Sequence, residues 1–220
     1  MKTHNDFSGY LFDMDGVLID SMPQHNMAFI LALGQYDLAL GDVEIAGKST
    51  MSVIEEVQQN NQAVDVPLLE LASLKQSIAR DLIFAEGKKV LAPNVDEVLS
   101  RLSLNSKIGI CTSGSKASLE YFLSLLSTDI KFDALMCVTD VEFAKPNPEI
   151  YLKGASKMGI PTKEVLVIED SSSGINAGLA AGCKVAQIGG AVLDEPIVTK
   201  RLFRINSLND LLVEANGLGS

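Results

Sequence analysis

The sequence lacks the features that identify membrane, secreted and repeat proteins. No stretch approaches the roughly 20 apolar residues of a membrane-spanning helix, and the polar segment 1–8 has no apolar run of the signal-peptide type. Internal repeats and low-complexity tracts are also missing. Apolar residues make up 47% and charged residues 21%, which excludes a disordered chain. We therefore expect a globular protein of the cytoplasm.

Positive charge is in deficit. The chain has 18 lysines and arginines against 28 aspartates and glutamates, which gives a formal net charge of −10. Nucleic acids and acidic membranes would repel such a chain at long range, so we expect neither as a partner. A small anionic substrate is compatible with this charge only if a metal ion, one or two lysines and backbone N–H groups supply positive charge locally.

Cysteine is scarce as well. Cys111, Cys137 and Cys183 are odd in number, widely spaced, and each placed in an apolar stretch. This pattern predicts buried, reduced thiols rather than a metal or redox site. It also favours a reducing compartment.

What the chain does contain is an alternation of strand-like and helix-like segments. Short apolar runs that do not alternate with polar residues are typical of strands buried on both faces. With amphipathic stretches between them, they predict an α/β fold built on a parallel, Rossmann-like sheet. The expected strands are 10–12, 107–111, 134–138, 165–168, 185–188 and, more weakly, 202–205; the expected helices are 95–104, 115–126, 148–158, 175–181 and 208–214.

One region breaks this alternation. Residues 22–88 contain no convincing strand, and instead hold helical segments at 24–33, 50–59 and 67–84. A helical block placed after the first strand predicts a small inserted domain. We expect a core domain of residues 1–20 and 90–220, and a mostly α-helical cap of residues 21–89.

Polar side chains follow four of the predicted strands. They lie in residues 13–16 (DMDG), 112–115 (TSGS), 145–148 (KPNP) and 169–172 (EDSS). Ligands bind at the carboxyl ends of the strands in open α/β sheets, so we expect these four stretches to meet at one edge. Together they supply four acids, a hydroxyl and a lysine.

Carboxylates crowded in this way need a counter-charge. They repel each other, and burial makes their ionisation costlier still. Oxygen ligands without a nearby histidine or cysteine favour Mg²⁺ over zinc, and Mg²⁺ commonly takes a phosphate oxygen of the substrate. Lys145, the Thr112 hydroxyl and backbone N–H groups can bind the remaining phosphate oxygens. The expected partner is therefore a small phosphorylated metabolite.

A family resemblance agrees with this chemistry. Residues 12–21 (FDMDGVLIDS) resemble the first motif of the haloacid dehalogenase superfamily. Thr112, Lys145-Pro146 and Glu169-Asp170 resemble its second, third and fourth motifs, in the same order. The helical block resembles the family's cap between motifs one and two. The resemblance covers nearly the whole chain and points to the subgroup of β-phosphoglucomutases and phosphoglycolate phosphatases.

The resemblance implies a role for each acid. Asp13 would be the nucleophile that forms an aspartyl-phosphate, and Asp15 would protonate the leaving oxygen and then activate water. The side chains of Asp13 and Asp170, with the backbone carbonyl of Asp15, would hold Mg²⁺. Glu169 would be a further ligand or a partner of the ligands. An aspartate at position 15 favours phosphate-ester chemistry, because dehalogenases and phosphonate-cleaving members lack it.

The remaining core residues would contact the phosphoryl group. The resemblance implies this role for Thr112 and Lys145. Ser113 is a further candidate, and Ser115 can either contact phosphate or N-cap the next helix.

In the cap, the resemblance draws attention to His25, Lys48 and Lys75 as substrate-side residues. The alternatives are a polar surface histidine and a solvated lysine on a helix face. In the mutase pattern the position of Thr50 carries an arginine that grips a second phosphate. Lys48 cannot reproduce the bidentate fork of an arginine, so the threonine counts against binding of two phosphates.

We therefore predict a monomeric, Mg²⁺-dependent phosphatase of small phosphate monoesters, with a phosphosugar mutase as the alternative. A third hypothesis is a signalling receiver domain, which also places acids, Mg²⁺, a hydroxyl and a lysine around a phosphorylated aspartate. Receiver domains are typically shorter, carry the phosphoacceptor later in the chain and have no inserted cap.

Overall fold

The computed structural model describes residues 7–43, 45, 50–61, 66–127, 129–189 and 199–212. The chain divides into two compact units. Residues 1–19 and 91–220 form the core unit, and residues 20–90 form the cap unit. Each unit is described by itself below.

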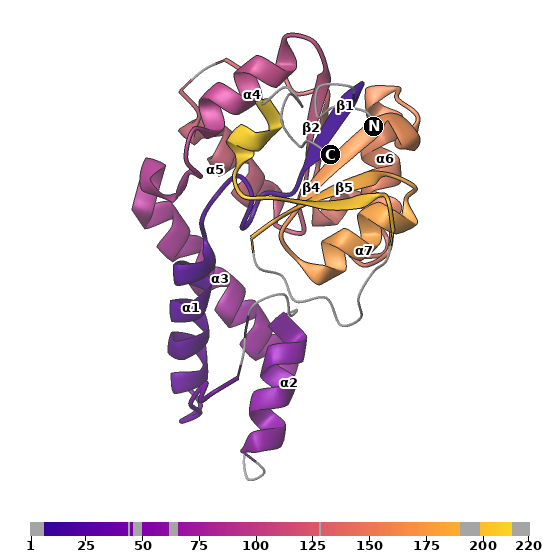
Figure 1. Ribbon diagram of the computed structural model, residues 1–220. Coiled ribbons are helices and arrows are strands. Elements are labelled where there is room, and N and C mark those ends of the chain that lie inside the picture. Colours follow the sequence, from indigo (N-terminus) through magenta and orange to yellow (C-terminus); the bar gives the residue numbers. More distant parts are fainter. Residues whose placement is uncertain are drawn as a thin grey trace. The chain divides into compact units, whose positions relative to one another are not determined.

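The core unit is built on a parallel sheet (Figure 1). β1 lies in its interior, paired with β2 on one side and β4 on the other, so that Phe12 lies beside both Ile110 and Ile168. Every residue of β1 and β4 is buried, as expected for apolar strands covered on both faces. The strands are β1 (Gly9–Phe12), β2 (Lys107–Cys111), β3 (Ala134–Met136), β4 (Val165–Glu169), β5 (Lys184–Ile188) and β6 (Leu202–Ile205), in the order β3-β2-β1-β4-β5-β6.

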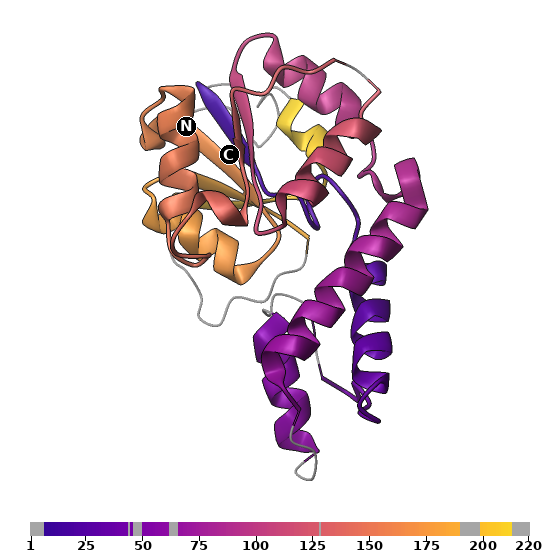
Figure 2. The ribbon, with the colours of Figure 1, turned by 180° about the vertical axis from the view of Figure 1, so that it is seen from behind.

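Helices cover both faces of this sheet. Figures 1 and 2 show α4 (Val95–Ser103) and α5 (Lys116–Leu125) on one side, and α6 (Glu149–Met158) and α7 (Ser172–Ala180) on the other. α6 and α7 bury apolar residues such as Tyr151 and Ile175 in one cluster with Leu11 of β1. Short 3₁₀ segments η3 (Val138–Asp140), η4 (Thr162–Glu164) and η5 (Leu208–Leu212) complete the core unit.

In the described part of the cap unit, all regular secondary structure is helical. It contains α1 (Met22–Gly34), α2 (Thr50–Asn60), α3 (Leu68–Glu86) and the 3₁₀ turn η2 (Gly87–Val90). These helices share their own apolar core, which includes Phe29, Leu33, Ile54, Val57 and Leu71. The prediction of a Rossmann-like core with a mostly helical insertion is confirmed.

The chain leaves the sheet and returns to it at one place. Ile19 forms an antiparallel bridge with Leu91 within the core unit, and the backbone N–H of Asp20 donates to the Val90 carbonyl (2.8 Å) within the cap unit. The two ends of the insertion are therefore paired with each other.

Several predicted boundaries need correction. The expected helix 208–214 is a 3₁₀ turn in its described part, the strand expected at 134–138 ends at Met136, and α7 begins at Ser172, three residues earlier than predicted. The early start of α7 has a cause, because the Ser171 hydroxyl accepts the N–H of Gly174 and caps the helix. The three cysteines are buried free thiols, as predicted. Along the described residues, each helix is too short or too polar to cross a membrane.

Candidate active site

Asp13 is the first residue after β1 and lies in the middle of the sheet edge. Its backbone N–H donates to the Ile168 carbonyl of β4 (3.0 Å), and its side chain is only 10% exposed. Gly16 then turns the chain with a φ of +79°, and a side-chain carbon there would overlap the carboxylate of Asp170. The loops after β1 and β4 are therefore in contact, and position 16 requires glycine.

Lys145 brings a buried positive charge to Asp13. Its amine donates to Asp13 Oδ1 (2.5 Å), Glu169 Oε1 (2.8 Å) and the Cys111 carbonyl (2.9 Å). An ammonium group has three N–H donors, so each of them has an acceptor. The Lys145 side chain is 4% exposed, so solvent screens these ion pairs little.

Glu169, the last residue of β4, is saturated with protein donors. Its Oε1 accepts the Lys145 amine and the Tyr151 hydroxyl (2.8 Å each). Its Oε2 accepts the backbone N–H groups of Asp170 (3.0 Å) and Ser171 (3.1 Å) and the Ser171 hydroxyl (2.9 Å). The fully buried carboxylate thus lies at the N-terminus of α7, where backbone N–H groups favour an anion.

Three carboxylates form a cluster at this edge. Asp13, Glu169 and Asp170 each offer an oxygen atom, and these atoms lie within 4.8 Å of one another. Hard oxygen donors at this spacing suit a divalent cation such as Mg²⁺. The structure therefore brings together three of the four predicted acids with Lys145.

The pKa shifts reflect the burial of charged groups first and their mutual repulsion second. Burial raises the pKa of Asp13 well above its ordinary value, with further upward contributions from Glu169 and Asp170, while Lys145 opposes the shift. Burial, followed by the charge of Glu169, raises the pKa of Asp170 to about 7. Burial also acts to raise the pKa of Glu169, but Lys145 and the hydrogen bonds outweigh it, so the pKa is lowered. At Asp13, Lys145 thus offsets only part of the effect of burial.

The other predicted core residues lie at the same strand ends. Thr112 follows β2, is buried, and accepts the Gly114 N–H at its hydroxyl oxygen (2.8 Å). Ser113 is exposed, and Asp15 is partly buried in the loop after β1. Ser115 N-caps α5 by accepting the N–H of Ser118, as the capping alternative predicts.

In the cap unit, two of the predicted residues contact each other. Lys75 is buried on α3, and its amine lies 3.0 Å from His25 Nδ1 and 4.4 Å from the centre of the Phe29 ring. Lys48 lies outside the described residues.

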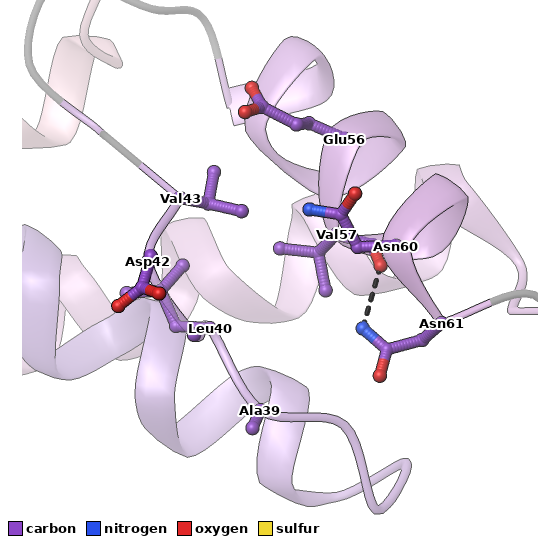
Figure 3. Close-up of a pocket in the computed structure, with 9 residues that line it drawn as sticks. Ala39, Leu40, Asp42, Val43, Glu56, Val57, Asn60 and Asn61 are labelled. Carbon is purple, nitrogen blue, oxygen red and sulfur yellow. Dashed lines mark hydrogen bonds between the residues drawn. The ribbon is translucent and has the colours of Figure 1, made fainter.

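A separate pocket of about 340 Å³ opens within the cap unit. Figure 3 shows Val43 and Val57 at its wall, with Asn61 donating to the Val57 carbonyl (2.8 Å). None of the predicted site residues in the described ranges lines this pocket. Its lining consists of Ala39–Val43, Glu56, Val57, Asn60 and Asn61. All of its lining residues belong to the cap unit.

Comparison with known proteins decides the family. The family model described as haloacid dehalogenase-like hydrolase matches residues 10–188. The chain belongs to this family. The resemblance inferred from the four motifs is thereby confirmed, and the match supports the expectation of a phosphohydrolase.

Relatives of this haloacid dehalogenase-like hydrolase include named phosphatases. It is 29% identical to fructose-1-phosphate phosphatase YqaB of Escherichia coli K12, over 83% of this chain and 96% of that protein. It is 30% identical to hexitol phosphatase A of the same organism, over 93% of each chain. A solved structure of β-phosphoglucomutase from Clostridium difficile has the same fold, with a TM-score of 0.70, 23% identity and coverage of 93% of each chain.

Two residues of the hydrolase site were missed by sequence reasoning. Tyr151 was assigned only to a helical stretch, although it follows Lys145 by six residues on the buried face of α6. Gly174 was given no part in the site. In the structure, a side-chain carbon at Gly174 would overlap Glu169 Oε1, so this glycine makes room for the buried carboxylate.

This close approach makes Gly174→Ala a sensitive test of the site. We expect the added methyl group to displace Glu169 and to lower the free energy of unfolding by about 1–3 kcal/mol, as overpacking of a core does. Urea unfolding measures the change. Gly34→Ala is the matched control, because Gly34 is also helical but has no atom within 4 Å of the added carbon, so this variant should be neutral or slightly stabilised. Equal stability of the two variants would show that Glu169 is not confined by Gly174.

Proposed function

We propose that this protein is a Mg²⁺-dependent phosphatase that hydrolyses small phosphate monoesters, such as sugar phosphates, through an aspartyl-phosphate on Asp13. The observation that carries the proposal is the buried cluster in which the Lys145 amine joins Asp13 to Glu169 beside Asp170. The names of two relatives, fructose-1-phosphate phosphatase and hexitol phosphatase A, support this substrate class. The three buried free thiols fit the reducing environment of the cytoplasm.

The residues present fit a magnesium ion. We assign its binding to the side chains of Asp13 and Asp170 and to the backbone carbonyl of Asp15. Glu169 already accepts five protein hydrogen bonds, which favours a role as partner of Lys145 over that of a direct ligand. When bound, the ion supplies positive charge that offsets the repulsion of the carboxylates and of the phosphoryl oxygens.

The chain's own residues then carry out two in-line displacements. In the first, an Asp13 oxygen forms a bond to phosphorus while the bond to the leaving oxygen breaks, and Asp15 gives that oxygen a proton. In the second, Asp15 takes a proton from water as the water oxygen bonds to phosphorus, and the bond to Asp13 breaks. Inorganic phosphate is released, and both aspartates return to their starting state.

Hydrogen-bond donors hold the phosphoryl group during both steps. Lys145, Thr112 and Ser113 are the donors that we assign to its oxygens, because they follow strands at the same edge as Asp13. For the leaving group we propose contacts from His25, Lys75 and Lys48 of the cap.

The residue at position 50 distinguishes the phosphatase hypothesis from the mutase hypothesis. It is the first residue of α2 and stands where the mutase pattern has an arginine. Without a bidentate group for a second phosphate, we expect hydrolysis rather than phosphoryl return to the sugar. The relatives near 30% identity bear phosphatase names, while the likeness to β-phosphoglucomutase at 23% identity shows the fold alone.

This expectation is tested with β-glucose 1-phosphate in the presence and absence of β-glucose 1,6-bisphosphate. We expect free phosphate as the product, at a rate that the bisphosphate does not increase. Coupled assays for inorganic phosphate and for glucose 6-phosphate distinguish the two reactions. Bisphosphate-dependent formation of glucose 6-phosphate would overturn the assignment, and a panel of other sugar and hexitol phosphates then ranks the substrates.

A further inference from the structure

Tyr151 contacts both members of the buried ion pair formed by Lys145 and Glu169. Its hydroxyl donates to Glu169 Oε1 (2.8 Å), the same oxygen that accepts the Lys145 amine. The face of its ring lies 5.0 Å from Lys145 Nζ, within the range of a cation–π interaction. The tyrosine side chain is completely buried.

The local chain brings about this double contact. Tyr151 lies in the first turn of α6, which begins directly after residues 145–148, and its N–H donates to the Pro148 carbonyl (3.0 Å). The helix thus returns the ring over the amine that precedes it by six residues. A single segment therefore supplies both the lysine and the group that restrains it.

The hydrogen bonds around Glu169 leave it little freedom. The Oε2 atom is fixed by two backbone N–H groups and the Ser171 hydroxyl, so the carboxylate cannot rotate without breaking them. The Tyr151 hydroxyl fixes the other oxygen, the one that faces Lys145. The amine is then held from one side by Glu169 and the Cys111 carbonyl, and its third N–H is directed at Asp13 Oδ1.

We propose that Tyr151 is a positioning residue, which acts through Glu169 to hold the Lys145 amine at the Asp13 oxygen where phosphoryl transfer takes place. The role rests on the proposed function, because it is exercised in the chemical step at Asp13. Removing the hydroxyl leaves the charges of the site unchanged but allows the Glu169–Lys145 pair to move. Small displacements of a group that stabilises charge in the transition state reduce kcat more than they affect binding of the substrate.

The test is Tyr151→Phe, which keeps the ring and deletes one oxygen atom. We expect kcat with p-nitrophenyl phosphate to fall about tenfold, the usual effect of losing a hydrogen bond to a charged group, with KM nearly unchanged. Tyr10→Phe is the matched control, since it removes the hydroxyl of another buried tyrosine of the core unit, one whose ring packs with Phe7 and Phe12. Tyr10→Phe should keep the kcat of the wild type, even if its melting temperature falls as much as that of Tyr151→Phe.

Crystal structures of the wild type and of Tyr151→Phe give a second readout that does not depend on turnover. We expect the Glu169 carboxylate and the Lys145 amine to shift or to adopt two conformations in the variant. An unchanged kcat, or a lower kcat with both groups in their original places, would overturn the positioning role. If the wild type hydrolysed none of the phosphate esters, the proposed function would fail, while the crystal structures would still show whether Tyr151 holds Lys145.

Discussion

Asp13→Asn should leave a folded protein that no longer releases phosphate from p-nitrophenyl phosphate. An amide in place of the carboxylate keeps the shape of the side chain but cannot attack phosphorus, so we expect kcat to fall at least about 10³-fold. Stability should not suffer, because burial and the neighbouring acids already disfavour the ionised form of Asp13 and raise its pKa. Phosphate release measures the first effect, and urea unfolding the second.

Asp20→Asn provides the control for this substitution. Asp20 lies seven residues further on, is exposed, and undergoes the same chemical change, but is not a member of the three-carboxylate cluster. Its activity should equal that of the wild type. Full activity of Asp13→Asn would remove Asp13 from the role of nucleophile. A wild-type aspartyl-phosphate that persists for minutes without turnover would instead favour the receiver-domain hypothesis.

Lys145→Met should be the most destabilising single change at the site. The substitution leaves Asp13 and Glu169 buried without their counter-charge, and breaking a buried ion pair from one side typically costs about 3–5 kcal/mol. Activity should be lost as well, because the amine that donates to Asp13 is gone. Urea unfolding in the absence of Mg²⁺ measures the loss of stability.

The loss caused by Lys145→Met should also depend on pH. Without the lysine, we expect burial and mutual repulsion to raise the pKa values of Asp13 and Glu169 above those in the unfolded chain. The folded state then binds more protons than the unfolded state, so stability falls as pH rises. The deficit relative to the wild type should therefore be larger near pH 8 than near pH 5.

Lys153→Met is the matched control for Lys145→Met. Lys153 also pairs with a carboxylate, that of Glu149 (2.6 Å), but its side chain is 49% exposed. A pair so accessible to water contributes little to stability, and its loss should leave activity intact. If Lys145→Met were no less stable than Lys153→Met, or if its deficit were the same at both pH values, the lysine would not be compensating buried carboxylates.

The sheet and the position of the site could be predicted because they depend on local patterns. Continuous apolar runs identify strands buried on both faces, and the parallel arrangement places the residues that follow them at one edge. Asp13, Lys145, Glu169 and Asp170 could thus be grouped before any coordinates were known. The helices α1, α2 and α3 of the cap unit could be predicted in the same way, from the spacing of apolar residues at 24–33, 50–59 and 67–84.

The contacts inside the site could not be predicted in this way. Periodicity shows that Tyr151 is on a buried face of a helix, but not that its hydroxyl meets Glu169, because that depends on how α6 packs on the sheet. Likewise, the sequence left open whether Glu169 binds metal directly. The five hydrogen bonds that its carboxylate accepts depend on the tertiary structure and could not be predicted. The turn at Leu208–Leu212 was expected as a helix because short amphipathic segments do not distinguish an α-helix from a 3₁₀ turn.

The paired ends of the cap have a consequence for how such a protein can be altered. Residue 19 forms a β-bridge with residue 91, and the N–H of residue 20 donates to the carbonyl of residue 90. The insertion therefore begins and ends at one pair of neighbouring chain segments. An insert whose ends meet imposes little strain on its host, and such places tolerate exchange of one insert for another. A foreign helical segment with equally close ends could replace residues 20–90 while the strands of the sheet keep their register. The residues at the strand ends of the core unit could in this way be combined with a different cap.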